Sequence, residues 1–159
     1  MNDYITKLLR RHRRTGVLLD ANILLLYFVG SFGPKEISRF KRTQQFTEED
    51  YSTLIKFLGS FKKVVTTPNI LTEVNNFMKR DYFEKFAQGI TLFDERYLPS
   101  ADISTDREFK RFGLTDAGIV NLARSHCLIL TDDFELSNYL AKEGVDVLNF
   151  NHIRVMSWK

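Results

Sequence analysis

The three consecutive apolar residues Val17-Leu18-Leu19 constrain the fold more than any other part of the sequence. A strand without polar positions needs burial on both faces, as the central strand of a parallel sheet does. Asp20 and Asn22 follow immediately, where the strand should end and a helix begin. In open α/β sheets, ligand sites form outside the carboxyl ends of the strands. We therefore expect a polar site around Asp20, which other acids can join if they lie at the same edge.

Hydrophobic patterns predict that strands and helices alternate along the rest of the chain. Further strands are predicted at residues 64–66, 127–130 and 145–149. The predicted helices cover residues 1–14, 22–29, 47–58, 68–79, 82–98, 114–123 and 134–142. The run 30–34, which contains two glycines and a proline, is expected to break the helix that starts at residue 22, and residues 150–159 receive no assignment. This alternation predicts an α/β fold, a three-layer α/β/α sandwich with a central parallel sheet.

One domain is expected for residues 1–159, because the sequence has no Pro-, Gly- or Ser-rich linker and only 3 prolines. Within it, residues 1–14 form a basic N-terminal helix and residues 30–63 a helical insertion. The single cysteine, Cys127, excludes a disulfide framework and favours a reducing, cytoplasmic environment. The apolar run 23–29 is far shorter than the ~20 residues of a membrane span, so no membrane partner is expected.

Three further acids are expected at the same edge as Asp20, namely Glu73, Asp116 and Asp133. Glu73 lies more than a turn into a predicted helix, on a face that is otherwise apolar, and Asp116 shares the apolar stripe of its own helix. A buried carboxylate without a partner costs several kcal/mol or takes up a proton. Taken singly, Asp20, Asp116 and Asp133 have another interpretation, because each is also well placed to cap a helix N-terminus.

Four carboxylates at one edge of a sheet would repel one another unless a cation lies among them. Mg²⁺ or Mn²⁺ is the expected ion, because these hard divalent cations prefer oxygen ligands and keep several waters. Such an ion lowers the pKa of a bound water and stabilises the leaving oxyanion in phosphodiester hydrolysis. The net charge of +3 is compatible with a polyanionic substrate.

The order of these motifs resembles that of the PIN-domain ribonucleases. The matching positions, between residues 16 and 149, are Asp20 with Asn22, then Glu73, then Asp116, and finally the run Thr131-Asp132-Asp133. The resemblance implies a three-layer α/β/α fold and Mg²⁺- or Mn²⁺-dependent cleavage of RNA by an endoribonuclease. The family's Thr-x-Asp spacing implies that Asp133 is a metal ligand, with Asp132 as the alternative.

The resemblance also implies roles for these residues. Asp20, Asp116 and Asp133 would bind the ion directly or through water, and Glu73 would ligate it or orient the attacking water. The groups expected to hold the acids by hydrogen bonds are Asn22 and Thr131. Many members of the family are toxins of toxin–antitoxin pairs, and dimers are frequent. An antitoxin protein and a homodimer are therefore implied as partners, besides the RNA substrate.

The insertion 30–63 offers a candidate RNA-binding surface. Its basic residues include Lys35, Arg39, Lys41 and Arg42, and phenylalanines are interleaved with them. Lysine and arginine contact phosphates, while exposed aromatic rings stack on the bases of single strands. The other interpretation is that the phenylalanines pack between the helices of the insertion.

A non-catalytic RNA- or protein-binding module with the same fold is the main alternative function. Two other enzyme classes with early aspartates fit less well. A haloacid-dehalogenase-like phosphatase needs a second aspartate where this chain has Asn22, and a receiver domain needs a lysine near Thr131, where none is found.

Overall fold

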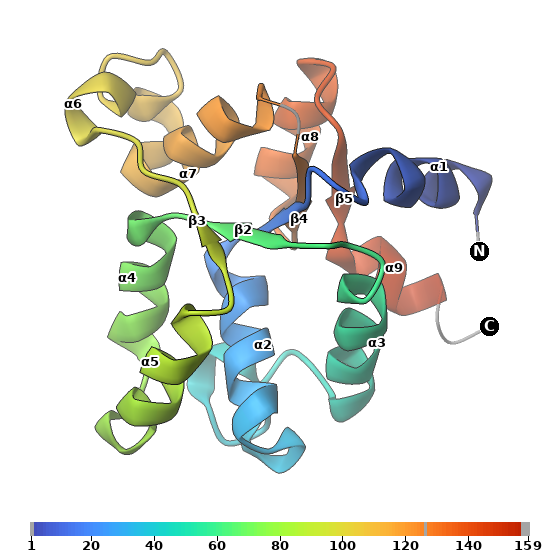
Figure 1. Cartoon of the computed structure of the whole chain (residues 1–159), viewed down its shortest axis with the longest axis vertical. Helices are drawn as coiled ribbons and strands as arrows, with labels where there is room; N and C mark the ends of the chain where they lie inside the picture. Colours follow the sequence, from blue (N-terminus) through green and yellow to red (C-terminus); the bar gives the residue numbers. More distant parts are fainter. Residues whose placement is uncertain (1, 126, 157–159) are drawn as a thin grey trace.

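The computed structural model describes residues 2–125 and 127–156, and its centre is a sheet of five strands. All pairings are parallel and the strand order is β3-β2-β1-β4-β5 (Figure 1). The strands are β1 (Val17–Leu19), β2 (Val64–Thr66), β3 (Asp94–Glu95), β4 (Leu128–Thr131) and β5 (Val147–Asn149). Predictions that concern residues 1, 126 and 157–159 lie outside the described residues.

The strand β1 is central, as predicted from its three apolar residues. Leu18 pairs with Val65 on one side and with Ile129 on the other. All three residues of β1 are fully buried. Because both neighbours are parallel to β1, the carboxyl ends of β1, β2 and β4 lie at the same edge of the sheet, which also places Asp20 there.

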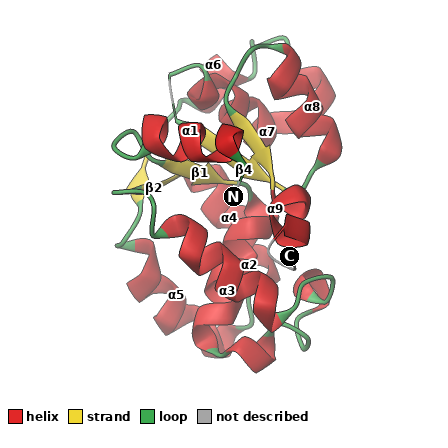
Figure 2. Cartoon of the chain, turned by 90° about the vertical axis from the view of Figure 1, so that its right-hand side faces the viewer, coloured by secondary structure: helices red, strands yellow, loops and turns green. Residues whose placement is uncertain are grey.

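Helices cover both faces of the sheet and complete the three-layer sandwich (Figures 1 and 2). The helices on one face are α2 (Ala21–Phe32), α3 (Glu48–Leu58), α4 (Pro68–Phe77) and α5 (Phe83–Ile90). Those on the other face include α7 (Phe109–Ala123) and α8 (Phe134–Lys142). The remaining helices are α1 (Asp3–His12), α6 (Ser100–Ile103), α9 (Phe150–Met156) and the short η1 (Pro34–Glu36), η2 (Lys41–Thr43) and η3 (Arg80–Tyr82). Within the described part of the chain, no helix is long and apolar enough to cross a membrane.

Three elements differ from the predictions. The predicted helix 82–98 is wrong in its second half, where the chain forms β3 instead. This strand has only two residues, both acidic, so its sequence carries no strand pattern and its pairing with β2 defines it. α2 ends at Phe32, within the run 30–34 that was expected to break it but three residues beyond the predicted end at residue 29. A Cβ at Gly30 would lie 2.2 Å from Tyr51 Cδ2, so the glycine allows α3 to approach α2 closely. The unassigned tail contains α9, anchored by the fully buried Phe150.

The helix starts that were predicted from capping residues are found in the structure. Thr47 and Asp50 form a capping box at the start of α3. Thr67 caps α4, with a proline in its first position. α7 is kinked at Gly113, whose φ of 81° lies in the left-handed region that favours glycine. The predicted helix 114–123, which carries Asp116, is the second part of α7 and begins directly after this kink.

Candidate functional site at the carboxyl ends of the strands

Asp20 lies directly after β1 and its carboxylate is held from two strands. Its Oδ1 accepts a hydrogen bond from the backbone N of Ile23 at 3.0 Å, which caps α2. Its Oδ2 accepts a bond from the hydroxyl of Thr131 and one from the backbone N of Asp132 at 3.3 Å. Asp20 is 6% exposed. The carboxylate therefore joins the carboxyl ends of β1 and β4 while it also caps a helix.

Thr131 organises the turn that follows β4. Its Oγ1 accepts a hydrogen bond from the backbone N of Asp133 at 3.0 Å and donates to Asp20. Asp133 in turn caps α8, because its Oδ1 accepts a bond from the backbone N of Leu136 at 3.0 Å. The capping interpretation of Asp20 and Asp133 is thus confirmed. It does not exclude a second role, because Asp133 is exposed and its Oδ2 makes no hydrogen bond with the described residues.

Asp132 is half-buried and receives three side-chain amides. Its Oδ1 accepts a bond from Asn22 at 3.4 Å and its Oδ2 a bond from Gln45 at 3.3 Å. The amide of Asn151 donates to its backbone oxygen at 3.1 Å. Asn22 was among the predicted residues, whereas Gln45 and Asn151 were missed. These two come from the insertion and from α9, and nothing in the local sequence indicates that they reach this edge.

Glu73 and Asp116 approach the same edge from α4 and from the second part of α7. Both are half-buried. Burial, together with the nearby charges of Glu73 and Asp133, raises the pKa of Asp116 to about 6. A pocket of about 430 Å³ beside them is lined by Glu73 and by Thr115, the neighbour of Asp116. The structure therefore brings all the predicted acids into one electrostatically connected group, which we call the acid cluster: Asp20, Glu73, Asp116, Asp132 and Asp133.

The pKa of Asp20 is raised further than that of Asp116, mainly because Asp20 is the more deeply buried of the two. Burial and the neighbouring charges of Asp132 and Asp116 together raise the pKa of Asp20 to about 8, although hydrogen bonds from Thr131 and Ile23 act to lower it. Burial also raises the pKa of Asp132. No lysine, arginine or histidine among residues 2–125 and 127–156 forms an ion pair with the acid cluster. Its charge is therefore left to be neutralised by protons or by an external cation.

The donor set fits a hard cation, although it is not assembled as a finished coordination sphere. Among the described residues, no group of three or more His, Cys, Asp or Glu is arranged as it would be around a metal ion. Mg²⁺ tolerates this better than most metals, because it binds through one or two carboxylates and keeps several waters. The raised pKa of Asp20 is the observation that fits such an ion, since the site disfavours its own negative charge.

The insertion carries the four basic residues predicted to contact RNA. Lys35, Arg39, Lys41 and Arg42 are all exposed. Arg39 pairs with Glu36 at 2.8 Å, and the guanidinium of Arg42 lies 4.2 Å from the centre of the Phe77 ring. Two phenylalanines of the insertion, Phe40 and Phe46, are buried. These rings pack inside the protein, in line with the second interpretation of the insertion.

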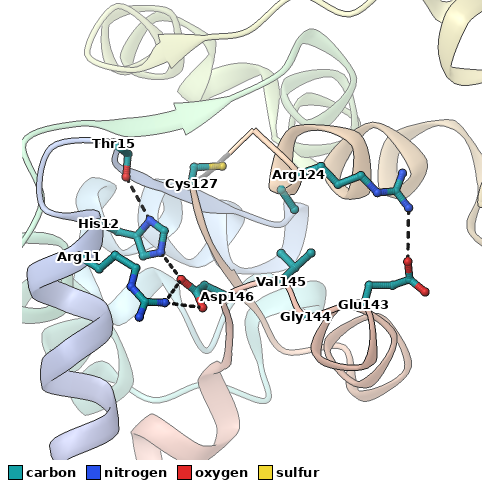
Figure 3. Close-up of a pocket in the computed structure, with 10 residues that line it drawn as sticks. Arg11, His12, Thr15, Arg124, Cys127, Glu143, Gly144, Val145 and Asp146 are labelled. Atoms are coloured by element: carbon teal, nitrogen blue, oxygen red, sulfur yellow. Dashed lines mark hydrogen bonds and ion pairs between the residues drawn. The ribbon is translucent and has the colours of Figure 1, made fainter.

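A second pocket, of about 570 Å³, lies at the opposite edge, where β1, β4 and β5 begin (Figure 3). His12 lies between Thr15 and Asp146, with Nδ1 3.1 Å from the Thr15 hydroxyl and Nε2 2.6 Å from the Asp146 carboxylate. Arg11 also pairs with Asp146, at 2.9 Å. Most ionisable groups of this pocket are thus paired with one another. The pairs of Arg11 and His12 with Asp146 connect α1 to the start of β5.

No family model, curated protein or solved structure matches this chain. The function must therefore be argued from the acid cluster and its surroundings.

Proposed function

We propose that the chain is a Mg²⁺- or Mn²⁺-dependent endoribonuclease and that the acid cluster is its active site. The observation that supports this most directly is the buried Asp20, whose pKa is raised to about 8 by burial and by the charges of Asp132 and Asp116. Clusters of carboxylates with perturbed pKa values at the carboxyl edge of a parallel sheet are characteristic of functional sites.

In this proposal, each acid acts from the position already described. Asp20, Asp116 and Asp133 hold the ion directly or through water, and Glu73 ligates it or orients the attacking water. Asp132 is the alternative ligand to Asp133, because its two carboxylate oxygens already receive side-chain amides. A bound ion would lower the pKa of a water molecule and neutralise charge on the leaving oxygen.

Two polar groups position the acids. The hydroxyl of Thr131 donates to Asp20 and accepts from the backbone N of Asp133, so it fixes the spacing between two proposed ligands. Asn22 donates to Asp132 from the first turn of α2. Such supporting hydrogen bonds commonly affect metal affinity by 10–100-fold.

RNA is the proposed substrate because the acid motifs resemble, in order and spacing, those of the PIN-domain ribonucleases. The α/β/α architecture is the one that the resemblance implies. The same resemblance underlies the proposals of an antitoxin partner, a homodimer and a cytoplasmic location. None of these is needed for the chemistry, so the cleavage assay below addresses the enzyme alone.

The test is cleavage of a fluorescent single-stranded RNA by purified protein in Mg²⁺, Mn²⁺ or EDTA. The wild type should cleave with either ion and not in EDTA. Asp20→Asn should lower the rate at least about 100-fold, because loss of one charged ligand removes several kcal/mol of transition-state stabilisation. Asp81→Asn changes an exposed acid outside the cluster and should leave the rate unchanged.

Two outcomes would contradict the assignment. Metal-dependent cleavage that persists in Asp20→Asn would place the active site elsewhere. A wild type that binds RNA but cleaves none with either ion would favour the non-catalytic binding module.

A further inference from the structure

The pocket of about 430 Å³ beside the acid cluster has the size of a small-ligand site. Its walls come from the first turns of α4, from the segment between β3 and α6, and from the second part of α7. Glu73 belongs both to this pocket and to the acid cluster, and Thr115 precedes Asp116. If a ligand fills the pocket, a chemical group attached to it on the side of Glu73 would therefore lie next to the acid cluster.

An exposed aromatic ring forms one wall of the pocket. Tyr97 is 82% exposed, more than any other large hydrophobic side chain in the described part of the chain. Its ring makes no contact with another aromatic ring of the described residues. Leu98 and Leu114, which also line the pocket, are half-buried. Together these three side chains form the apolar part of the lining, with one free aromatic face.

Three polar side chains on the other walls have no hydrogen-bond partner in the described part of the chain. The side chains of Asn69, Ser100 and Thr115 line the pocket, and none makes a hydrogen bond to the described residues. An amide and two hydroxyls provide both donors and acceptors. An apolar lining with a few such groups has the composition of a site that binds a flat, polar-edged ligand.

We infer that this pocket receives the unpaired base of the nucleotide next to the cleaved phosphodiester bond, an inference that rests on the proposed function. Tyr97 stacks on the base, while Asn69 and Ser100 face its hydrogen-bonding edge. The phosphate attached to that nucleotide then lies toward Glu73 and the rest of the acid cluster. A base in a duplex is stacked on both sides and paired along its edge, so only single-stranded RNA can enter.

The experiment measures RNA binding apart from cleavage. A five-nucleotide single-stranded RNA with a central 2-aminopurine is mixed rapidly with wild-type protein in Mn²⁺, and the early fluorescence change reports stacking. Tyr97→Ala should weaken binding about 10-fold, because stacking on an aromatic side chain contributes roughly 1–3 kcal/mol per base. Tyr97→Phe keeps the ring and should bind within about 2-fold of wild type.

Controls separate this role from a structural one. Tyr4→Ala removes another exposed tyrosine, on α1, and should not change binding. Thermal melts of Tyr97→Ala should match those of the wild type, since the side chain is almost fully exposed. An unlabelled RNA duplex should compete far less well than an unlabelled single strand.

Several results would overturn the inference. These are wild-type binding by Tyr97→Ala, equal loss in Tyr97→Phe and Tyr97→Ala, and equal competition by duplex and single strand. If wild type cleaves RNA and Tyr97→Ala is unaffected, only the base pocket fails. If wild type neither binds nor cleaves RNA, the proposed function fails as well.

Discussion

The protein contains two kinds of buried carboxylate: some are paired with arginine, and those of the acid cluster are not. Asp50 and Glu108 have side chains that are 1% exposed, and each is paired with arginine. Arg154 binds both oxygens of Asp50, at 3.0 and 2.5 Å. Arg124 binds Glu108 at 2.5 Å, and Tyr139 donates to the same carboxylate at 2.8 Å.

The consequence is visible in the pKa values. Burial acts to raise the pKa of Glu108, but hydrogen bonds from Arg124, Tyr139 and Arg107 outweigh it and bring the value to about 2. At Asp20, burial and neighbouring acids act in the same direction and the pKa rises to about 8. Outside the acid cluster, Asp50 and Glu108 have arginine partners, whereas no arginine in the described part of the chain pairs with an acid of the cluster. That difference is expected of a structural pair on one side and of a site that recruits an external cation on the other.

The largest effect should come from breaking a structural pair. Arg154→Met leaves Asp50 buried and charged without its partner, and it also removes the bond from Arg154 to the Gln45 backbone. Loss of one partner of a buried pair costs about 3–5 kcal/mol. Urea denaturation should show a decrease of this size in the free energy of unfolding.

Arg39→Met is the matched control for that experiment. Arg39 pairs with Glu36 at 2.8 Å, but its side chain is 66% exposed. Exposed pairs typically contribute 0–1 kcal/mol. If Arg154→Met lowers the free energy of unfolding no more than Arg39→Met does, buried Asp50 does not depend on its arginine. The contrast between paired and unpaired buried carboxylates would then fail.

The acid cluster should respond in the opposite direction. In EDTA, Asp20→Asn removes a carboxyl group that on folding must either keep a disfavoured charge or take up a proton, so it should raise the thermal midpoint of unfolding. In wild type, Mn²⁺ at 100 times its dissociation constant should add about 2.7 kcal/mol to the stability, which is roughly 5–10 °C for a domain of this size. Asp20→Asn should lose that Mn²⁺ response, whereas Asp81→Asn should keep it. An equal Mn²⁺ shift in Asp20→Asn would place the ion elsewhere.

Much of the fold followed from local sequence signals. The strand β1 has three apolar residues in a row, and Thr47, Thr67 and Asp133 precede helices as capping residues do. β3 and the close approach at Gly30 depend on partners that are distant in the sequence. A two-residue acidic strand has no pattern of its own, and a glycine that makes room for Tyr51 resembles a glycine that ends a helix.

The residues of the candidate site likewise fall into two groups: those with a local sequence signal and those placed by contacts that are distant in the sequence. The acids were predictable because each directly follows a strand or breaks an apolar helix face. Gln45 and Asn151 were not, because their contacts with Asp132 span 87 and 19 residues of sequence. The same holds for Tyr97, which lines one pocket with Glu73 because the chain leaves β3 in a segment that was predicted to be helical. The residues that contact the acids or line the adjoining pocket are thus harder to predict from sequence than the acids themselves.

The smallest predicted effect, measured per pH unit, is the pH dependence of stability in EDTA. It is also the most direct test of the difference between Asp20 and Glu108. Native Asp20 has a pKa of about 8, above its ordinary value of 3.8, so the native state binds more protons than the unfolded state between these limits. Stability from this group is fully present below about pH 4 and is lost as the pH rises through 8. The slope is at most about 1.4 kcal/mol per pH unit.

Glu108 should give the opposite slope in a different pH range. Its pKa of about 2 lies below its ordinary value of 4.5, so its contribution is present above pH 4.5 and is lost as the pH falls through 2. Urea denaturation from pH 5 to 8 should therefore show stability falling in wild type and in Glu108→Gln. The fall should be much smaller in Asp20→Asn, with a residual slope near pH 6 from Asp116, whose pKa is about 6. If Asp20→Asn keeps the full wild-type slope, the charge of Asp20 is compensated in solution and the acid cluster has no need of a cation.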